Sequence, residues 1–424
     1  MGSMKRLDLY RRSRGVQRER ESSGESTVER QSLLEELKEK TGGEIVTREG
    51  KSYLRIEELL PRNHVHGAVP LQRSYGDHAE FLKTLFPHFA RCGGPNKTLK
   101  DMLFFDIETT GLSGGAGTHL FLIGLLRVMD RGILCTQFFM HSLSSERLYL
   151  DAIADGLTDQ KILVSFNGKS YDYNILKNRY IMTGLPFFSK EPLHLDLLYT
   201  SRRIWRGLFP DYSLSTVENR ALQVNRHDDI PGWQIPEVYT DYLRGRGAAS
   251  DILRIIRHNR EDVLSLLALL IRQIELIRDV VGGNRKDEAY FNPITLSDML
   301  LSGERREDAF TLLSAHDDSN EALKKLGFLC KRDRQFEKAL KHFEALRSRR
   351  VGLRDYIFAC TEAAKIYEHQ LLDYRSALQC TEKMLRRVER ARHLSGGTDD
   401  VAHQGERSAI VHRLNRLRRK LEKR

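Results

Sequence analysis

The run MLFFDIE at residues 102–108 has the clearest β-strand pattern in this chain, because four apolar residues lead into an acidic pair. Two further β-rich runs, HLFLIGLLRV at 119–128 and GILCTQFFM at 132–140, follow it across glycine-bearing turns. A helical pattern at 144–157 and a short apolar run, KILVSF at 161–166, come next. Three adjacent strands followed by alternating helix and strand predict an α/β sheet with an antiparallel edge.

The rest of the chain has helical patterns. Apolar residues recur at helical spacing over 170–182, 193–205 and 251–276, and strand patterns end at about residue 283. The residues at the offsets of a tetratricopeptide repeat are Leu326, Gly327, Ala339 and Phe343, with Tyr367 and Ala377 in a weaker second copy. We therefore expect packed helical pairs. Their identity as true repeats stays open, because any helical hairpin supplies half of these matches.

The length of the chain predicts several packed units. With 424 residues and a mass of 49.0 kDa, about two or three domains are expected. The expected parts are a disordered basic tail (1–31), a small N-terminal extension (32–98), the α/β domain (99–282), a tetratricopeptide-like all-α region (283–394) and a basic C-terminal helix or tail (395–424).

The composition excludes several classes of protein. A charged fraction of 30% and a mean hydropathy of −0.47 leave no stretch that resembles a bilayer span. Five cysteines without CxxC spacing argue against a disulfide framework and a zinc ribbon. The basic start is not followed by an apolar run, so we expect no secretory signal and a cytoplasmic location.

Positive charge collects at the two ends of the chain. Of the net charge of +11, residues 1–30 contribute +3 and residues 384–424 contribute +7. A sequence pI near 9.3 indicates a polyanionic partner such as nucleic acid, or else basic arms that only meet solvent.

Two acidic residues end the first predicted strand. Residues two apart on a strand face the same side, so Asp106 and Glu108 point together. At about 4 Å such charges repel by ~4 kcal/mol at an effective dielectric of about 20, so the pair needs a cation or a proton. A solvated strand end is the structural alternative.

Two later carboxylates complete a set of four. Asp172 follows the strand predicted at 161–166 and begins a helix, whose positive end favours an ionised side chain; a simple helix cap is the alternative. Asn167, just before it, either holds the turn or contacts a ligand. Further along, His258 and Asp262 are four residues apart and share one helical face, where an ordinary surface pair is the alternative.

The order D-x-E, D, D of these carboxylates resembles the DEDD superfamily of 3′-to-5′ exonucleases. A closer resemblance, to the YprB-like family of bacterial ribonuclease-H-like exonucleases, covers roughly residues 53–276. It rests on these motifs: GGAGTHLFLIG (114–124), SFNGKSYD (165–172), HLDLLYTSRRIW (194–205), SLSTVE (213–218), DDIPG (228–232) and HNREDVLSL (258–266). The resemblance implies a ribonuclease-H-like mixed sheet flanked by helices, DNA 3′-end degradation, divalent metal dependence and DNA repair alongside a helicase partner.

The last motif departs from the two main DEDD subclasses, which carry His five residues before the final Asp or Tyr four residues before it. Here Arg257 stands at the first of these positions and His258 at the second. His258 therefore has the position of the tyrosine with the chemistry of a histidine. Since an imidazole titrates near neutral pH, it is a candidate to orient or deprotonate the attacking water.

Four carboxylates with no thiol suit hard cations, so we expect two Mg²⁺ or Mn²⁺ ions and no zinc. Asp106, Glu108 and Asp262 are expected to hold the ion that activates water, and Asp106 and Asp172 the ion at the leaving 3′ oxygen. Together with these ions, the resemblance implies a 3′-to-5′ exodeoxyribonuclease acting on single-stranded DNA or 3′ ends. The alternatives are a structure-specific endonuclease with the same ions, and a non-catalytic nucleic-acid-binding adaptor that docks partners through its helical region.

Candidate substrate contacts lie near these motifs. Tyr171 either stacks on a base or belongs to the core, while Arg202 and Arg203 either track phosphates or face solvent. His64 and His66 in the segment NHVHG share a strand face, but without a third ligand we do not expect a metal site there. The sequence leaves the choice between DNA and RNA open.

Overall fold

The computed structural model describes residues 31–89, 97–111, 117–157, 162–188, 191–283, 290–394 and 401–423. The chain divides into two compact units, with the boundary after Phe291. The tail predicted to be disordered lies, apart from residue 31, outside the described residues. Among the described helices none is long and apolar enough to cross a membrane.

A seven-stranded mixed sheet forms the centre of the first unit, with the strand order β1-β2-β7-β6-β5-β8-β9. Strands β1, β2, β7, β6 and β5 are antiparallel neighbours, whereas β8 and β9 run parallel to β5. The bounds are β1 (Glu44–Arg48), β2 (Lys51–Leu60), β5 (Met102–Thr109), β6 (Leu120–Met129), β7 (Gly132–Phe139), β8 (Ile162–Ser165) and β9 (Leu193–Asp196). The predicted α/β sheet with an antiparallel edge is confirmed.

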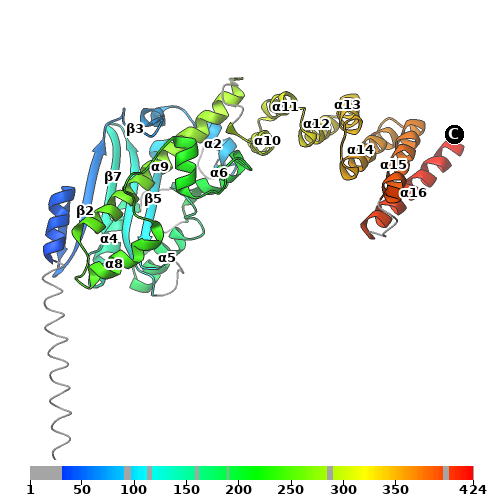
Figure 1. Cartoon of the computed structure of the whole chain (residues 1–424). Coiled ribbons are helices and arrows are strands. Elements are labelled where there is room, and N and C mark those ends of the chain that lie inside the picture. Colours follow the sequence, from blue (N-terminus) through cyan, green and yellow to red (C-terminus); the bar gives the residue numbers. More distant parts are fainter. Residues whose placement is uncertain are drawn as a thin grey trace, which may run out of the picture. The chain divides into compact units, whose positions relative to one another are not determined.

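Helices cover both faces of this sheet (Figure 1). The 33-residue helix α9 (Ala249–Val281) packs across β5, β6 and β7 together with α8 (Ile235–Leu243). On the opposite face lie α4 (Glu146–Leu157) and α5 (Asp172–Thr183). The ribonuclease-H-like mixed sheet flanked by helices is therefore confirmed.

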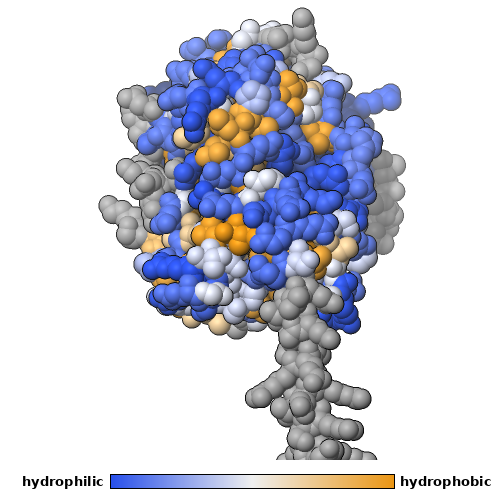
Figure 2. Space-filling model, turned by 90° about the vertical axis from the view of Figure 1, so that its left-hand side faces the viewer, coloured by the Kyte–Doolittle hydropathy of each residue, from blue (hydrophilic) through white to orange (hydrophobic). Residues whose placement is uncertain are grey.

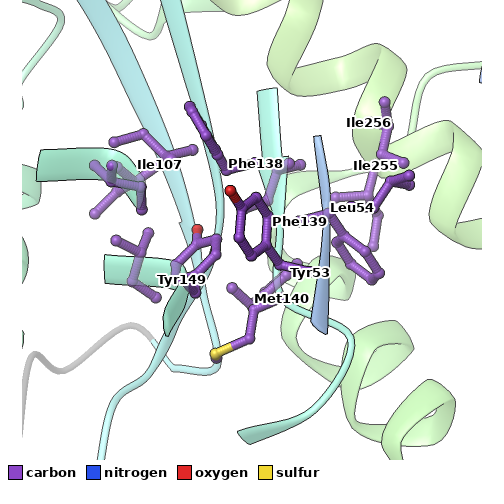
Figure 3. Close-up of a cluster of buried hydrophobic side chains, with 14 of the residues drawn as sticks. Tyr53, Leu54, Ile107, Phe138, Phe139, Met140, Tyr149, Ile255 and Ile256 are labelled. Atoms are coloured by element: carbon purple, nitrogen blue, oxygen red, sulfur yellow. The ribbon is translucent and has the colours of Figure 1, made fainter. Parts of the chain in front are cut away.

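The core follows the alternation of side chains along the strands. Tyr53 contacts both Phe138 and Tyr149 of α4 on one side of the sheet. Phe139 packs on the other side toward Ile255 of α9 (Figure 3). On the face shown in Figure 2, hydrophilic residues predominate and hydrophobic ones gather only in separate patches. Strands β5, β6, β7 and β8 thus bury both of their faces, which suits their nearly continuous apolar sequences.

Shorter elements connect these layers. Among them are β3 (Val65–His66), β4 (Val69–Pro70), η1 (Leu71–Tyr75), α2 (Ala79–Leu85), η2 (Leu99–Asp101), η3 (Leu143–Ser145), α6 (Leu197–Ile204), α7 (Leu214–Val217), η4 (Glu218–Leu222) and η5 (Gly232–Gln234). The tight β3–β4 turn contains Gly67, at φ +58°, and an added Cβ there would lie 2.2 Å from the Leu222 carbonyl oxygen. Glycine is therefore required where this turn meets the end of η4.

The second unit is all-helical over its described residues. Its helices are α10 (Pro293–Ser302), α11 (Arg306–Ala315), α12 (Asn320–Arg332), α13 (Phe336–Ser348), α14 (Leu353–His369), α15 (Tyr374–Leu394) and α16 (Val401–Glu422). Gly327 of α12 lies against the Phe343 ring of α13, where a Cβ would come within 2.5 Å of the ring. The predicted all-helical region is confirmed, while its identity as a tetratricopeptide array stays a prediction.

Candidate metal-dependent active site

Strand β5 carries the first two predicted acidic residues beneath α9. In the antiparallel register with β6, Asp106 lies opposite Gly124 and Glu108 lies opposite Leu122. Both carboxylates are half-buried, and Asp106 is in hydrogen-bond contact with Asn259 of α9. The alternation of the strand therefore directs this pair toward α9, as a separation of two residues predicts.

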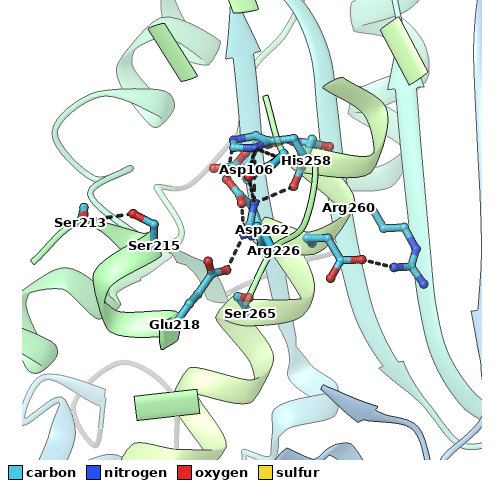
Figure 4. A network of polar contacts seen from close by, with 12 residues as sticks. Asp106, Ser213, Ser215, Glu218, Arg226, His258, Arg260, Asp262 and Ser265 are labelled. Carbon is cyan, nitrogen blue, oxygen red and sulfur yellow. Dashed lines mark hydrogen bonds and ion pairs between the residues drawn. The ribbon is translucent and has the colours of Figure 1, made fainter. Parts of the chain in front are cut away.

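Helix α9 brings the third motif to the same place. His258 Nε2 lies 3.6 Å from Asp262 Oδ2 and 4.0 Å from Glu108 Oε1. One ligand atom from each of these three residues lies within 4.8 Å of the other two (Figure 4 shows His258 and Asp262 beside Asp106). The shifted register of the histidine thus still places its ring at the acidic pair.

Asp172 approaches the group from the start of α5. Its side chain is buried, and the charges of Asp196 and Asp262 act on it. The loop before it is held by Asp196, which accepts the backbone N–H groups of Asn167 at 2.8 Å and Lys169 at 3.2 Å. Asn167 itself has a left-handed backbone, at φ 63°, so it shapes the turn that aims Asp172.

The predicted substrate-contact residues lie in varied surroundings. The Tyr171 hydroxyl donates to the Gly111 carbonyl at 2.9 Å, and the half-buried ring packs against the core. Arg202 is exposed on α6, and the neighbouring Arg203 is half-buried. Tyr171 therefore has a structural partner, whereas Arg202 is open to solvent.

Burial and mutual repulsion act on the acidic group together. Burial, followed by the charge of Asp262, raises the pKa of Asp106 well above its usual range. Burial likewise raises the pKa of Glu108 to about 8 and that of Asp172 to about 7. Ionising these buried and mutually repelling carboxylates is favourable only beside a positive charge. Carboxylate oxygens together with one imidazole nitrogen are ligands that Mg²⁺ or Mn²⁺ can accept. The residues present therefore fit a divalent cation.

Arg226 is a basic residue of this site that the sequence analysis missed. Its guanidinium donates to both Glu218 and Asp262, and it contacts His258 Nδ1 at 3.3 Å (Figure 4). Burial raises the pKa of Glu218 to about 7 against the opposing charge of Arg226. Glu218 closes the quoted motif SLSTVE, but no pattern singled out Arg226.

Asp229 orients the histidine. Its two carboxylate oxygens lie 2.9 Å and 3.0 Å from His258 Nδ1, so Nδ1 is the donor and Nε2 faces Glu108 and Asp262. Burial works to lower the pKa of His258, but Asp229, Asp262 and Glu108 together raise it to about 9.

A buried amide chain fixes Asp106. Asn259 donates to the Asp106 carbonyl at 3.1 Å and to its carboxylate at 3.0 Å, and accepts from Gln137 at 2.8 Å. An added Cβ at Gly124 would lie 2.4 Å from the Asn259 side-chain oxygen. Glycine is needed at 124 because the amide occupies that space.

The segment NHVHG supports the site from behind. His66 is buried, and its Nε2 lies 2.7 Å from the Ser265 hydroxyl of α9. Burial lowers the pKa of His66 to about 3, so the ring is neutral. Ser265 hydrogen-bonds Glu218 in turn, which links β3 to the Glu218–Arg226 pair.

Comparison with known proteins agrees with this geometry. Residues 103–273, from β5 through most of α9, match the family model described as RNase_H superfamily. The chain is also 28% identical over 346 residues to the uncharacterized protein YprB of Bacillus subtilis (strain 168), across 78% of this chain and 80% of the relative.

Proposed function

We propose that this chain, a YprB-like protein with a ribonuclease H superfamily domain, is a metal-dependent 3′-to-5′ exonuclease acting on DNA. The observation that carries the proposal is the convergence of Glu108, His258 and Asp262 within 4.8 Å, next to Asp106. Exonuclease polarity rests on the order of the carboxylate motifs, and the choice of DNA rests on the family resemblance. The family resemblance alone supports DNA repair and a helicase partner, whereas a cytoplasmic location rests on the composition and the cysteine pattern.

Each side chain has a role in this mechanism. Asp106, Glu108 and Asp262 would hold one cation, and Asp106 with Asp172 the second. Bound there, the cations supply positive charge that lowers the pKa of both the attacking water and His258, and that stabilises the leaving 3′ oxygen. His258 Nε2 accepts the proton of the water, while Asp229 keeps Nδ1 as a donor.

The test is a time course on 5′-labelled single-stranded, duplex and nicked DNA and on matched RNA, in Mg²⁺, Mn²⁺ or EDTA. Wild-type protein is expected to shorten DNA stepwise from its 3′ end when metal is present. Asp106→Asn should abolish cleavage. Asp130→Asn is the matched control, because Asp130 is exposed at the β6–β7 turn and its loss should leave cleavage intact.

A second readout follows the metal itself. Mn²⁺ titration monitored by electron paramagnetic resonance should show weakened binding in Asp106→Asn and unchanged binding in Asp130→Asn. Cleavage by folded Asp106→Asn in the presence of metal would refute the site. Internal cuts would favour the endonuclease, and DNA binding without any cleavage would favour the adaptor.

A further inference from the structure

Most of the net positive charge of this chain lies in the helical unit. Residues 292–424 contain 28 Lys/Arg and 20 Asp/Glu, so they carry +8 of the total of +11. The last two helices contribute strongly, since α15 and α16 each hold six basic and two acidic residues.

Four cations of α15 form one stripe along its exposed side. They are Arg375, Lys383, Arg386 and Arg390, and each is exposed. At 3.6 residues per turn they fall within an arc of about 80°, and they extend over about 22 Å of the helix. The side of α15 that includes Ala377, Met384 and Val388 is buried. The stripe, named here the α15 stripe, therefore faces solvent while the helix is anchored from behind.

The acidic residues that could neutralise the α15 stripe are already paired with α16. Glu382 pairs with Arg418 at 3.4 Å, and Glu389 pairs with Arg407 at 3.8 Å. Arg375 donates its backbone N–H to the Asp373 carboxylate and meets its negative charge. The side chains of Lys383, Arg386 and Arg390 have no ion pair or hydrogen bond with a residue that the structure describes. Pairing with α16 thus occupies both acidic residues of α15 and leaves Lys383, Arg386 and Arg390 without a counter-charge.

We propose that the α15 stripe binds the phosphate backbone of a nucleic acid, as a contact separate from the acidic site. The choice of occupant rests on the proposed function, because a chain that cuts phosphodiesters meets polyanions. Three of the four side chains are arginines, which pair with phosphate through two donors. The other exposed residues of this arc are Gln379 and His393. Contact is therefore electrostatic and independent of base sequence.

The test is equilibrium binding of the full chain, in EDTA, to a fluorescently labelled duplex of about 30 base pairs over about 50–300 mM salt. The variant is Arg375→Gln, Lys383→Gln, Arg386→Gln and Arg390→Gln combined. At about 0.9 per phosphate contact, the slope of log K against log salt should become shallower by about 3–4. Affinity at the lowest salt should fall by at least about tenfold.

A matched control removes the same charge elsewhere in the unit. Arg332, Arg334, Lys338 and Lys341 are also exposed, but Asp333 and Glu337 lie among them. Their combined change to Gln should alter affinity little. Equal losses in the two variants would show a bulk charge effect and overturn the proposal, as would unchanged binding in a folded α15 variant.

Two further arms identify the occupant and separate this proposal from the nuclease. If the combined α15 variant loses binding to anionic phospholipid vesicles but still binds DNA, the stripe contacts a membrane surface and the proposal is overturned. Cleavage by Asp106→Asn is scored on its own. If that variant cleaves, the proposed active site fails while the binding result still stands, because binding is measured in EDTA.

Discussion

Replacing Arg226 by methionine should both destabilise the first unit and stop cleavage. The Arg226 side chain is 13% exposed, and its partners Glu218 and Asp262 are 2% and 12% exposed. Removing one member of a buried ion pair leaves the other charge without compensation, at a cost of about 3–5 kcal/mol. Because the pKa of Glu218 is already raised to about 7, Glu218 can take up a proton, so we expect the lower end of this range.

The assay combines thermal denaturation with metal-dependent cleavage. A loss of about 3 kcal/mol corresponds to a fall in Tm of roughly 6–12 °C for a unit of this size. Adding Glu218→Gln removes the buried charge as well, so the double variant should regain most of that stability. Cleavage measured below both melting temperatures should stay low, because Asp262 still lacks its donor.

Two results would refute this reasoning. Wild-type Tm in Arg226→Met would show that the pair is not buried in the way described. Recovery of cleavage together with stability in the double variant would show that Arg226 supports the fold and does not position the catalytic groups.

Three further changes test other parts of the structure. Gly124→Ala should push Asn259 away from Asp106 and lower the free energy of unfolding by about 1–3 kcal/mol. Thermal denaturation should then show a lower Tm and nuclease assays a slower rate. A wild-type Tm together with a wild-type rate would contradict the packing described. His66 is neutral in the fold, where its pKa is about 3 against the usual 6.5, so only the unfolded state gains a proton as the pH falls below 6.5. Between pH 7 and pH 5 the wild type should therefore lose about 2 kcal/mol more stability than His66→Gln. Equal losses in the two proteins would argue against a buried neutral ring. Burial works to raise the pKa of Glu368, but Arg416 and Lys420 bring it down to about 2 from 4.5. The stabilisation by this carboxylate, at most about 3 kcal/mol, is therefore present above pH 4.5 and is lost toward pH 2. Urea denaturation of Glu368→Gln should show a lower free energy of unfolding than the wild type at pH 7 and no difference near pH 2, and an equal difference at both pH values would be inconsistent with this linkage.

Local patterns in the sequence determined most of the strands and helices and the shared side of Asp106 and Glu108. They were wrong at the start of the helix predicted over 193–205, where residues 193–196 form strand β9. A strand repeats every two residues and a helix every 3.6, so these features need only neighbouring positions. The pairing of α12 with α13 followed in the same way, because Gly327 leaves room for Phe343. The order of the four carboxylates was readable for the same reason, although their convergence required the fold.

Only the tertiary structure decided which residues surround those carboxylates. Arg226 reaches Asp262 across 36 residues, and Asn259 reaches Asp106 across 153. No local period encodes such contacts, since they depend on how α9 lies over β5. The α15 stripe has the same origin. The sequence shows its cations, but only the pairing of α16 arginines with Glu382 and Glu389 determines that Lys383, Arg386 and Arg390 lack counter-charges. Contacts between residues far apart in the sequence form only when the helices and strands pack together, so they are a property of the whole fold.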